Sequence, residues 1–572
     1  MKFLIRKIYI ILFLMSTLLF GVNVFAKESK IQYTKENISN YFSGIVSANY
    51  ADSKSAFKHL KKVQSLKNHH SNYNIQFLRT LVLLEKFEQA FEFAKNAWRE
   101  NELFFEADLM IGLYYFLKQE NFEAEKHFKR LNNMYKYDIV FQNLVGNVLL
   151  SLTKASENNE IESLQYLNKI PDRYFYLKKI QKSFIYCHFG KKETENLFRE
   201  LIENEDYDFS RYSFFLVSTL LHDNKNLEAK KIIDNLREKH FSNLLINQTG
   251  NLILNNKLEK VKNFFNCKNP KDVIAEFLYI IANLHANEKD YELSNFYLKI
   301  SLFINNKFEM NKTLLAENLY YQKKYKLSEN VFYSLKPISE TYSWHSSKSI
   351  ASILLDTVGK ERSISSLKKE FDLLKNRNFK HYYEMANFYK DNEYFEESIK
   401  YYSLALQNIN SDHYLFPKIL DRRGSSFERI GEWEKAEKDL TESLKILPDE
   451  PYVLNYLAYS WVEKKINLDK ALEMLRHAVS LKENDGYIID SLGWAYYAKK
   501  DYIKAEKFLR EAVKLKPEDP VINDHYADSL WMLNKDIQAR YVWKYVLSLD
   551  DIKEELRDNV NNKLTFGITN ES

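Results

Sequence analysis

Residues 486–520, GYIIDSLGWAYYAKKDYIKAEKFLREAVKLKPEDP, place Gly493, Ala505 and Ala512 inside an otherwise bulky aromatic and aliphatic run. A glycine in a helix interior costs roughly 1 kcal/mol relative to alanine, so Gly493 requires a packing reason. Small side chains let two helix backbones approach closely, and the large residues around them fill the remaining space. The stretch therefore predicts two packed antiparallel helices.

The same pattern recurs in the neighbouring segments, 34 or 35 residues away. With Gly493 as position 8 of a unit, position 8 also falls on Gly424, Ala458 and Ala527. Positions 4, 7, 11, 20, 24, 27 and 32 of the quoted unit hold Ile489, Leu492, Tyr496, Ala505, Leu509, Ala512 and Pro517. This spacing resembles the tetratricopeptide repeat (TPR) family. The resemblance implies an all-α fold, a right-handed α-solenoid of stacked helix–turn–helix units.

Two residues of the quoted unit mark the ends of its second helix. Asp501 stands where an N-cap for that helix is needed, and Pro517 cannot continue the helix. We therefore expect the second helix to begin just after Asp501 and to end before Pro517.

The period predicts about fifteen units, because Gly44 and Ala527 are 483 residues and 14 steps apart. The other position-8 candidates are Ala386, Ala351, Ala316, Ile281, Gly250, Val217, Lys182, Gly146, Gly112 and Leu78. We expect degenerate repeats in 37–280, TPR-like repeats in 274–378 and well-matched repeats in 379–550; the spacing is least regular in 150–280. In 551–572, Ile552, Leu556, Val560 and Leu564 recur every fourth residue, which predicts a capping helix and tail.

Residues 1–26, MKFLIRKIYIILFLMSTLLFGVNVFA, have the features of a secretory signal peptide. Basic residues precede an apolar run, and Val24 and Ala26 occupy the −3 and −1 positions of a cleavage site. If the segment stays uncleaved, the 19 residues 8–26 can span about 30 Å of hydrocarbon. Whether the segment is cleaved or retained, the repeats should be exported. The Lys-, Asn- and Ile-rich composition fits a Gram-negative bacterium. We expect the periplasm or cell envelope, with membrane contact only through an uncleaved segment.

Cys187 and Cys267 are the only cysteines, and they lie about two predicted units apart. Packed helix axes are about 8 to 10 Å apart, so a separation of two units exceeds the ~7 Å that a disulfide allows between Cα atoms. We therefore expect two buried or semi-buried thiols. His59, His69 and His70 form a weak candidate metal cluster, for which a polar turn between helices is the favoured interpretation.

Charge and motif content argue against nucleic acid binding and against catalysis. The chain has 83 basic and 78 acidic residues, and the basic residues are intermixed with acids along the helices. The sequence contains no Gly-rich phosphate loop, G-x-S-x-G, H-E-x-x-H or C-x-x-C motif. We expect a protein that is not an enzyme and takes no cofactor, metal or nucleic acid, and whose partner is a protein or peptide.

Positions 2, 5, 9, 12 and 13 of each first helix point away from its packed side. The resemblance implies that these positions line a concave groove. The partner-binding candidates are Tyr452, Asn455, Tyr459, Tyr487, Asp490, Trp494, Tyr497, Asp524, Asp528, Trp531 and Met532. Aromatic residues interleaved with carboxylates are typical of binding hot spots. The alternative is that the aromatic rings fill the contacts between repeats and that the acids are solvated surface groups. This alternative is favoured for the tyrosines, whereas the two interpretations are equally supported for Trp494 and Trp531.

One known family function can be tested by position. The clamp that grips a terminal carboxylate in some TPR domains needs lysine, asparagine and arginine at set places. Asn387 matches one of them, but Tyr383, Arg422, Tyr452 and Tyr456 occupy the others. The clamp is therefore absent here, and an acidic, aromatic groove suits a basic or aromatic-rich segment.

These observations predict a non-catalytic scaffold or adaptor in the cell envelope that binds a partner segment in its groove. The alternative is a regulatory or recruiting subunit of a cell-wall enzyme. An enzyme in its own right would require activity from the purified protein alone.

Overall fold

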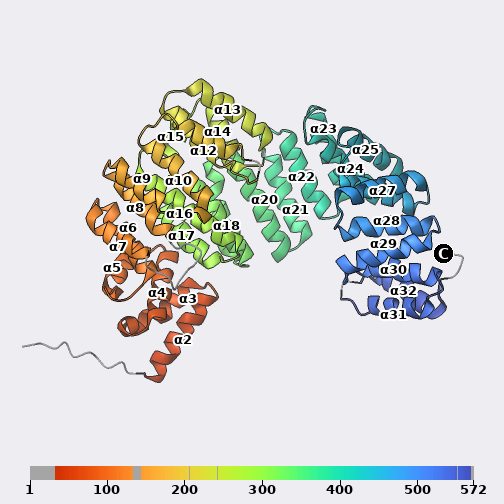
Figure 1. Cartoon of the computed structure of the whole chain (residues 1–572), viewed down its shortest axis with the longest axis horizontal. Coiled ribbons are helices and arrows are strands. Elements are labelled where there is room, and N and C mark those ends of the chain that lie inside the picture. Colours follow the sequence, from red (N-terminus) through yellow and green to blue (C-terminus); the bar gives the residue numbers. More distant parts are fainter. Residues whose placement is uncertain (1–32, 133–142, 205, 241, 551, 569–572) are drawn as a thin grey trace, which may run out of the picture. The chain divides into compact units, whose positions relative to one another are not determined.

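The computed structural model describes residues 33–132, 143–204, 206–240, 242–550 and 552–568, and within these ranges it contains helices and no strand (Figure 1). Within the described ranges, fourteen pairs of consecutive α-helices pack against each other, each an A helix followed by a B helix. The pairs are α2 (Lys35–Asn49) with α3 (Ser53–Leu60), α4 (Ser71–Leu83) with α5 (Phe87–Ala97), α6 (Phe105–Leu117) with α7 (Asn121–Leu131), α8 (Val145–Ser156) with α9 (Glu160–Asn168), α10 (Phe175–His188) with α11 (Thr194–Ile202), α12 (Tyr212–His222) with α13 (Asn226–Lys239), α14 (Leu244–Leu254) with α15 (Leu258–Phe264), α16 (Pro270–Asn287) with α17 (Tyr291–Ile304), α18 (Lys312–Tyr321) with α19 (Tyr325–Leu335), α22 (Phe379–Asp391) with α23 (Phe395–Gln407), α24 (Phe416–Arg429) with α25 (Trp433–Ile446), α26 (Pro451–Glu463) with α27 (Leu468–Leu481), α28 (Gly486–Ala498) with α29 (Tyr502–Leu515), and α30 (Pro520–Met532) with α31 (Asp536–Val546). The remaining α-helices are α20 (Glu340–Thr357), α21 (Lys360–Asp372) and α32 (Glu554–Phe566).

The predicted all-α solenoid of about fifteen units is confirmed, because each A helix contains one of the expected position-8 residues. The packing reason for Gly493 is also confirmed. A Cβ added at Gly493 would lie 2.6 Å from Cγ of Leu509, sixteen residues later on the B helix. Gly44 faces Leu60 and Gly424 faces Leu440 at the same offset. In these three units position 8 of helix A thus packs directly onto position 24 of helix B, whereas Gly250 faces Arg237 of the preceding helix.

The turn between the A and B helices repeats a backbone feature that the sequence analysis missed. In most pairs one residue, seven after position 8, has a positive φ, as at Lys465 (56°), Lys500 (64°) and Asn534 (58°). Non-glycine residues adopt this left-handed conformation reluctantly. Its recurrence at lysine and glutamate, as at Lys465, Lys500 and Glu85, indicates that the packing of the helix pair, more than local preference, determines the turn.

The predicted ends of the B helix in the quoted unit are confirmed. The side chain of Asp501 accepts a hydrogen bond from the backbone N–H of Lys504 at 3.2 Å, as an N-cap does. Helix α29 ends at Leu515, two residues before Pro517.

The chain divides into two compact units, residues 1–359 and 360–572. In the described part of unit 1, pairs far apart in the sequence contact each other: α4 packs on α17, and α16 packs on α8. The rings of Phe87 and Phe303 stack with their centroids 4.1 Å apart, and Lys324 Nζ donates to the carbonyl of Tyr50 at 2.7 Å. Unit 1 therefore doubles back on itself, whereas a simple solenoid buries each repeat only against its neighbours.

The expectation of two thiols is wrong, because Cys187 and Cys267 form a disulfide with their Cα atoms 5.9 Å apart. Helix α15 has only seven residues and is followed by Phe265 in an extended conformation. The carbonyl of Phe265 accepts a hydrogen bond from Ser218 Oγ at 3.1 Å, which returns the chain to α12. The segment thus leaves the regular stack, and the spacing of stacked helices does not set the distance between the cysteines.

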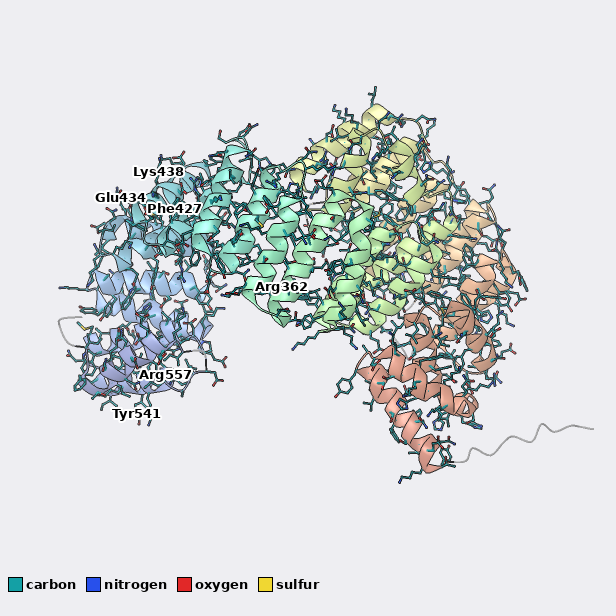
Figure 2. The ribbon with its side chains drawn as sticks, turned by 180° about the vertical axis from the view of Figure 1, so that it is seen from behind. Arg362, Phe427, Glu434, Lys438, Tyr541 and Arg557 are labelled. Carbon is teal, nitrogen blue, oxygen red and sulfur yellow. A yellow bond between two sulfur atoms is a disulfide. The ribbon has the colours of Figure 1, made fainter. Side chains whose placement is uncertain are left out.

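Unit 2 contains the quoted stretch and ends with α32. Its A helices contact one another in sequence, α26 with α28 and α28 with α30. Val560 of α32 is buried against α30 and α31, and Ile552, Leu556 and Leu564 are packed beside it. Figure 2 shows the side chains from behind, with Tyr541 on α31 and Arg557 on α32 at the surface.

No helix among the described residues has the length and apolar character needed to span a membrane. The expected signal peptide, residues 1–26, lies outside the described residues.

Candidate functional site

The candidate site is the side of α26, α28 and α30 on which their outward positions lie, and we call it the A-face. It carries the residues predicted from positions 2, 5, 9 and 12. Tyr452 and Tyr487 are exposed; Asn455, Tyr459, Trp494, Tyr497 and Trp531 are half-buried; Asp490, Asp524 and Asp528 are buried. The acids are therefore not solvated surface groups, and each must be compensated within the fold.

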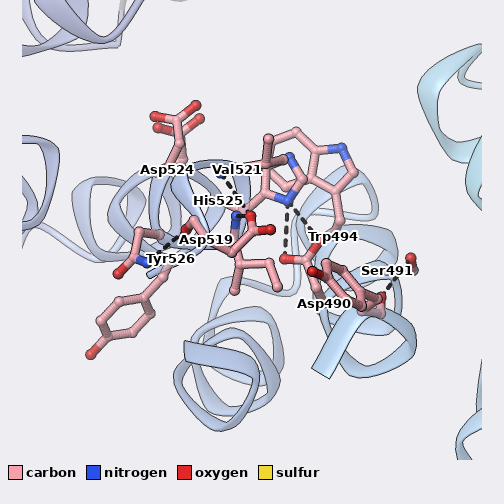
Figure 3. Close-up of polar contacts among 12 residues, drawn as sticks. Asp490, Ser491, Trp494, Asp519, Val521, Asp524, His525 and Tyr526 are labelled. Atoms are coloured by element: carbon pink, nitrogen blue, oxygen red, sulfur yellow. Dashed lines mark hydrogen bonds and ion pairs between the residues drawn. The ribbon is translucent and has the colours of Figure 1, made fainter. Parts of the chain in front are cut away.

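An aromatic stack joins α28 to α30. The ring of Trp494 stacks on that of Tyr497, with centroids 4.5 Å apart and an interplanar angle of 10°. It also stacks on the ring of His525, with centroids 3.9 Å apart and an angle of 11° (Figure 3). The indole N–H of Trp494 donates to Glu463 Oε1 at 2.6 Å, which ties the stack to the end of α26. Three successive A helices are thus linked through one half-buried tryptophan.

The buried carboxylate of Asp490 pairs with His525. His525 Nδ1 lies 3.1 Å from both carboxylate oxygens of Asp490 (Figure 3). Burial on its own lowers the pKa of His525, but the charge and hydrogen bond of Asp490 outweigh burial, so the pKa is raised. The pair therefore favours an imidazolium stacked on Trp494, a cation–π arrangement.

A second polar cluster surrounds Asp524 and Asp528, one turn apart on α30. Lys563 of α32 donates to Asp524 Oδ2 at 2.8 Å and to Asp528 Oδ2 at 2.7 Å. Asp528 Oδ1 accepts from the indole N–H of the buried Trp543 at 3.1 Å. Burial, together with the neighbouring Asp524 charge, raises the pKa of Asp528 to about 7 in spite of Lys563. The negative charge of Asp528 is therefore energetically unfavourable in this buried cluster.

The chain just after α32 covers Trp531. Gly567 has a φ of 75°, and a Cβ added there would overlap the indole ring of Trp531. The other side of Trp531 contacts Trp543, with centroids 5.5 Å apart, and the guanidinium of Arg540, 5.3 Å from the ring. Trp531 is therefore a packing residue for the C-terminal segment, whereas Trp494 has only A-face neighbours in its stack.

The first part of the A-face is more open. The hydroxyl of Tyr452 donates to Asp485 Oδ2 at 3.3 Å, and Lys516 Nζ lies 4.9 Å from the ring centroid of Tyr487. Burial, with the nearby Glu463 carboxylate, raises the pKa of Tyr459. Among the described residues, Asn455 Oδ1 is a buried acceptor without a hydrogen-bond partner.

Sequence reasoning missed His525 and Lys563. His525 occupies position 6, one residue outside the set of outward positions, and Lys563 lies in a helix that was interpreted only as a cap. A usable signal was present for His525: it follows Asp490 by 35 residues, close to one repeat, which places an acid and a base on adjacent helices. No local pattern singles out Lys563, because its partners belong to another helix pair.

Other candidates from the sequence have partners inside the fold. Asn387 Oδ1 accepts from the hydroxyl of Tyr402 at 2.7 Å and from Arg422 at 3.1 Å. His59 Nδ1 lies 3.0 Å from Asn40 Oδ1, and His70 lies beside Tyr33. Within the described ranges no three histidine, cysteine or acidic residues are grouped as metal ligands would be.

Comparison with known proteins identifies the repeat. Residues 488–519 match the family model described as tetratricopeptide repeat. A TPR repeat-containing protein of Pseudomonas aeruginosa is 30% identical over 103 residues, which cover 18% of this chain and 18% of that protein. The match thus spans less than a fifth of that relative's length.

Solved structures also match in part. MamA of Desulfovibrio magneticus is 19% identical, with a TM-score of 0.28, and covers 31% of this chain and 97% of its own. A tetratricopeptide repeat protein of Parabacteroides merdae is 16% identical, with a TM-score of 0.33, over 39% of this chain and 88% of its own. A chain of the APC/C hetero-tetramer Cut9–Hcn1 is 15% identical, with a TM-score of 0.34, and the match covers 86% of this chain and 90% of that one.

Proposed function

We propose that this chain, which carries a tetratricopeptide repeat at residues 488–519, is a non-catalytic scaffold that binds a segment of a partner protein across the A-face. The observation that carries the proposal is the half-buried stack of Tyr497, Trp494 and His525, which links adjacent A helices and lies among carboxylates. Aromatic anchors with polar groups at their edges are typical of the residues that dominate protein–protein binding.

The charges of the A-face favour a basic or aromatic-rich partner segment. Glu463 and Asp490 both contact the aromatic stack, and their only cationic counterpart there is His525 among the described contacts. A partner's arginine or lysine would gain from these carboxylates, whereas a terminal carboxylate would be repelled.

We place this activity in the periplasm or cell envelope. Lys2, Arg6 and Lys7, followed by the apolar run, support export by their resemblance to a signal peptide. The disulfide between Cys187 and Cys267 supports the same location, because disulfides persist in oxidising compartments and are rare in the cytosol.

The test is copurification of the tagged full chain after mild crosslinking, compared with Trp494→Ala. A partner that is recovered with the natural chain and lost with Trp494→Ala supports the proposal. The matched control is Tyr541→Ala, which removes an exposed ring from α31, away from the A-face. Equal recovery with both variants would refute the proposed site. A peptidoglycan hydrolase as the recovered partner would identify the chain as a regulator of a cell-wall enzyme.

A further inference from the structure

The A-face of the last repeat is already occupied by the end of this chain. Residues 552–568 bring Lys563 onto Asp524 and Asp528 and lay Gly567 against Trp531. These three A-face residues were expected from the sequence to receive a partner. Each is instead in contact with the C-terminal segment.

We infer that the C-terminal segment 552–568 is a built-in competitor for the A-face, and that a partner segment must place a lysine or arginine between Asp524 and Asp528 to displace it. The inference rests on the proposed function, since it concerns the same face. Beyond that function, the inference specifies that the partner segment is cationic and that residues 552–568 regulate its binding.

A cation is required because the two carboxylates are buried. Removing Lys563 without a replacement would leave two uncompensated acids one helical turn apart, which is strongly unfavourable in a buried site. A neutral or acidic segment therefore cannot take the place of Lys563, whereas a cationic one can. Within the described chain, Asp524 Oδ1 is a buried acceptor with no hydrogen-bond partner, although Asp524 is only 5% exposed. A guanidinium has enough donors to reach this oxygen as well.

The C-terminal segment is held by few buried contacts. Val560 is the only fully buried residue of α32, and Leu556 and Leu564 are partly buried beside it. Most of the other side chains of α32, including Arg557, are exposed (Figure 2). Lys563 and the bond from Arg540 to the carbonyl of Leu564 supply the polar attachment. Helices with few buried apolar contacts open at low free energy. A competing cation can therefore replace α32 without unfolding the repeats beneath it.

The experiment measures binding of fluorescein-labelled octalysine to the full chain by anisotropy. We expect Lys563→Gln to bind octalysine about tenfold more tightly than the natural chain, because the internal competitor is lost. The double variant Asp524→Asn with Asp528→Asn should lose this binding. The matched control is Lys504→Gln, which removes a lysine paired with Asp501 on the surface of α29 and should leave the affinity unchanged. Equal affinities for Lys563→Gln and Lys504→Gln would overturn the inference.

A second measurement uses the natural chain and does not depend on the variants folding well. Hydrogen exchange is followed with and without saturating octalysine. Faster exchange of the amides of α32, with α30 unchanged, is expected if the segment is displaced. Unchanged exchange in α32 would overturn the inference. Either negative result leaves the copurification test with Trp494→Ala intact, so the two proposals fail separately.

Discussion

The imidazole of His525 lies flat on the indole of Trp494, with ring centroids 3.9 Å apart, and its Nδ1 faces both oxygens of Asp490. One histidine thus joins a buried acid to a half-buried aromatic ring across two consecutive A helices. The protonation state of His525 therefore affects the packing between α28 and α30.

The first prediction concerns pH. Because the pKa of His525 is raised above its ordinary value of 6.5, the Asp490–His525 pair stabilises the fold fully below pH 6.5, and this contribution is lost as the pH rises through the raised pKa. We expect the melting temperature of the natural chain to fall more between pH 6 and pH 9 than that of Asp490→Asn. His525→Gln, which removes the titrating group, should match Asp490→Asn. An identical pH dependence in all three proteins would contradict the assignment.

The second prediction concerns the contact between position 8 and position 24. Gly493→Leu should destabilise unit 2 by about 1 to 3 kcal/mol, because the new side chain would overlap Leu509. Urea unfolding followed by circular dichroism measures the change. Lys507→Leu, at an exposed site on α29, is the control and should change stability little. If both variants unfold at the same urea concentration, the close approach at Gly493 is not required.

The third prediction separates two tryptophans. Trp543 is fully buried, so Trp543→Ala should cost about 3 to 5 kcal/mol of unfolding free energy. Trp494 is half-buried, so Trp494→Ala should cost much less while weakening recovery of a bound partner. Chemical denaturation and copurification of the same two variants give both quantities. A loss of stability at Trp494 as large as that at Trp543 would make Trp494 a core residue.

The fourth prediction concerns the disulfide. Replacing Cys187 and Cys267 by alanine should destabilise unit 1 by about 2 to 4 kcal/mol, because the bond closes a loop with a sequence separation of 80 residues. Unit 2 should be unaffected, and hydrogen exchange resolved by segment distinguishes the two. In the natural chain, unfolded without reductant, neither cysteine should react with maleimide. Labelling of both thiols under those conditions would show that the bond is absent.

Much of the fold follows from periodicity within about 35 residues. Gly493, Leu509 and Asp501 have the neighbours that their spacing predicts, since a helix pair is made by residues close in the sequence. The A-face positions were identified in the same way, because outward positions of a helix are determined by its 100° rotation per residue. The repeat spacing also offered a signal for His525, one repeat after Asp490, whereas the contact of Lys563 with Asp524 and Asp528 could not be predicted from it, because Lys563 lies in the helix that follows the last repeat.

The sequence by itself determined the helix pairs, their number and the small residues at their crossings, because these depend on contacts within a repeat. Only the tertiary structure decided that Cys187 meets Cys267, that Phe303 stacks on Phe87, and that Lys563 reaches Asp524 and Asp528. The first two contacts depend on the small rotation between successive pairs, summed over several repeats, and on where a short helix such as α15 interrupts the stack. The contact of Lys563 depends on how α32 packs on the last pair. No local pattern of residues specifies the accumulated rotation or the placement of α32.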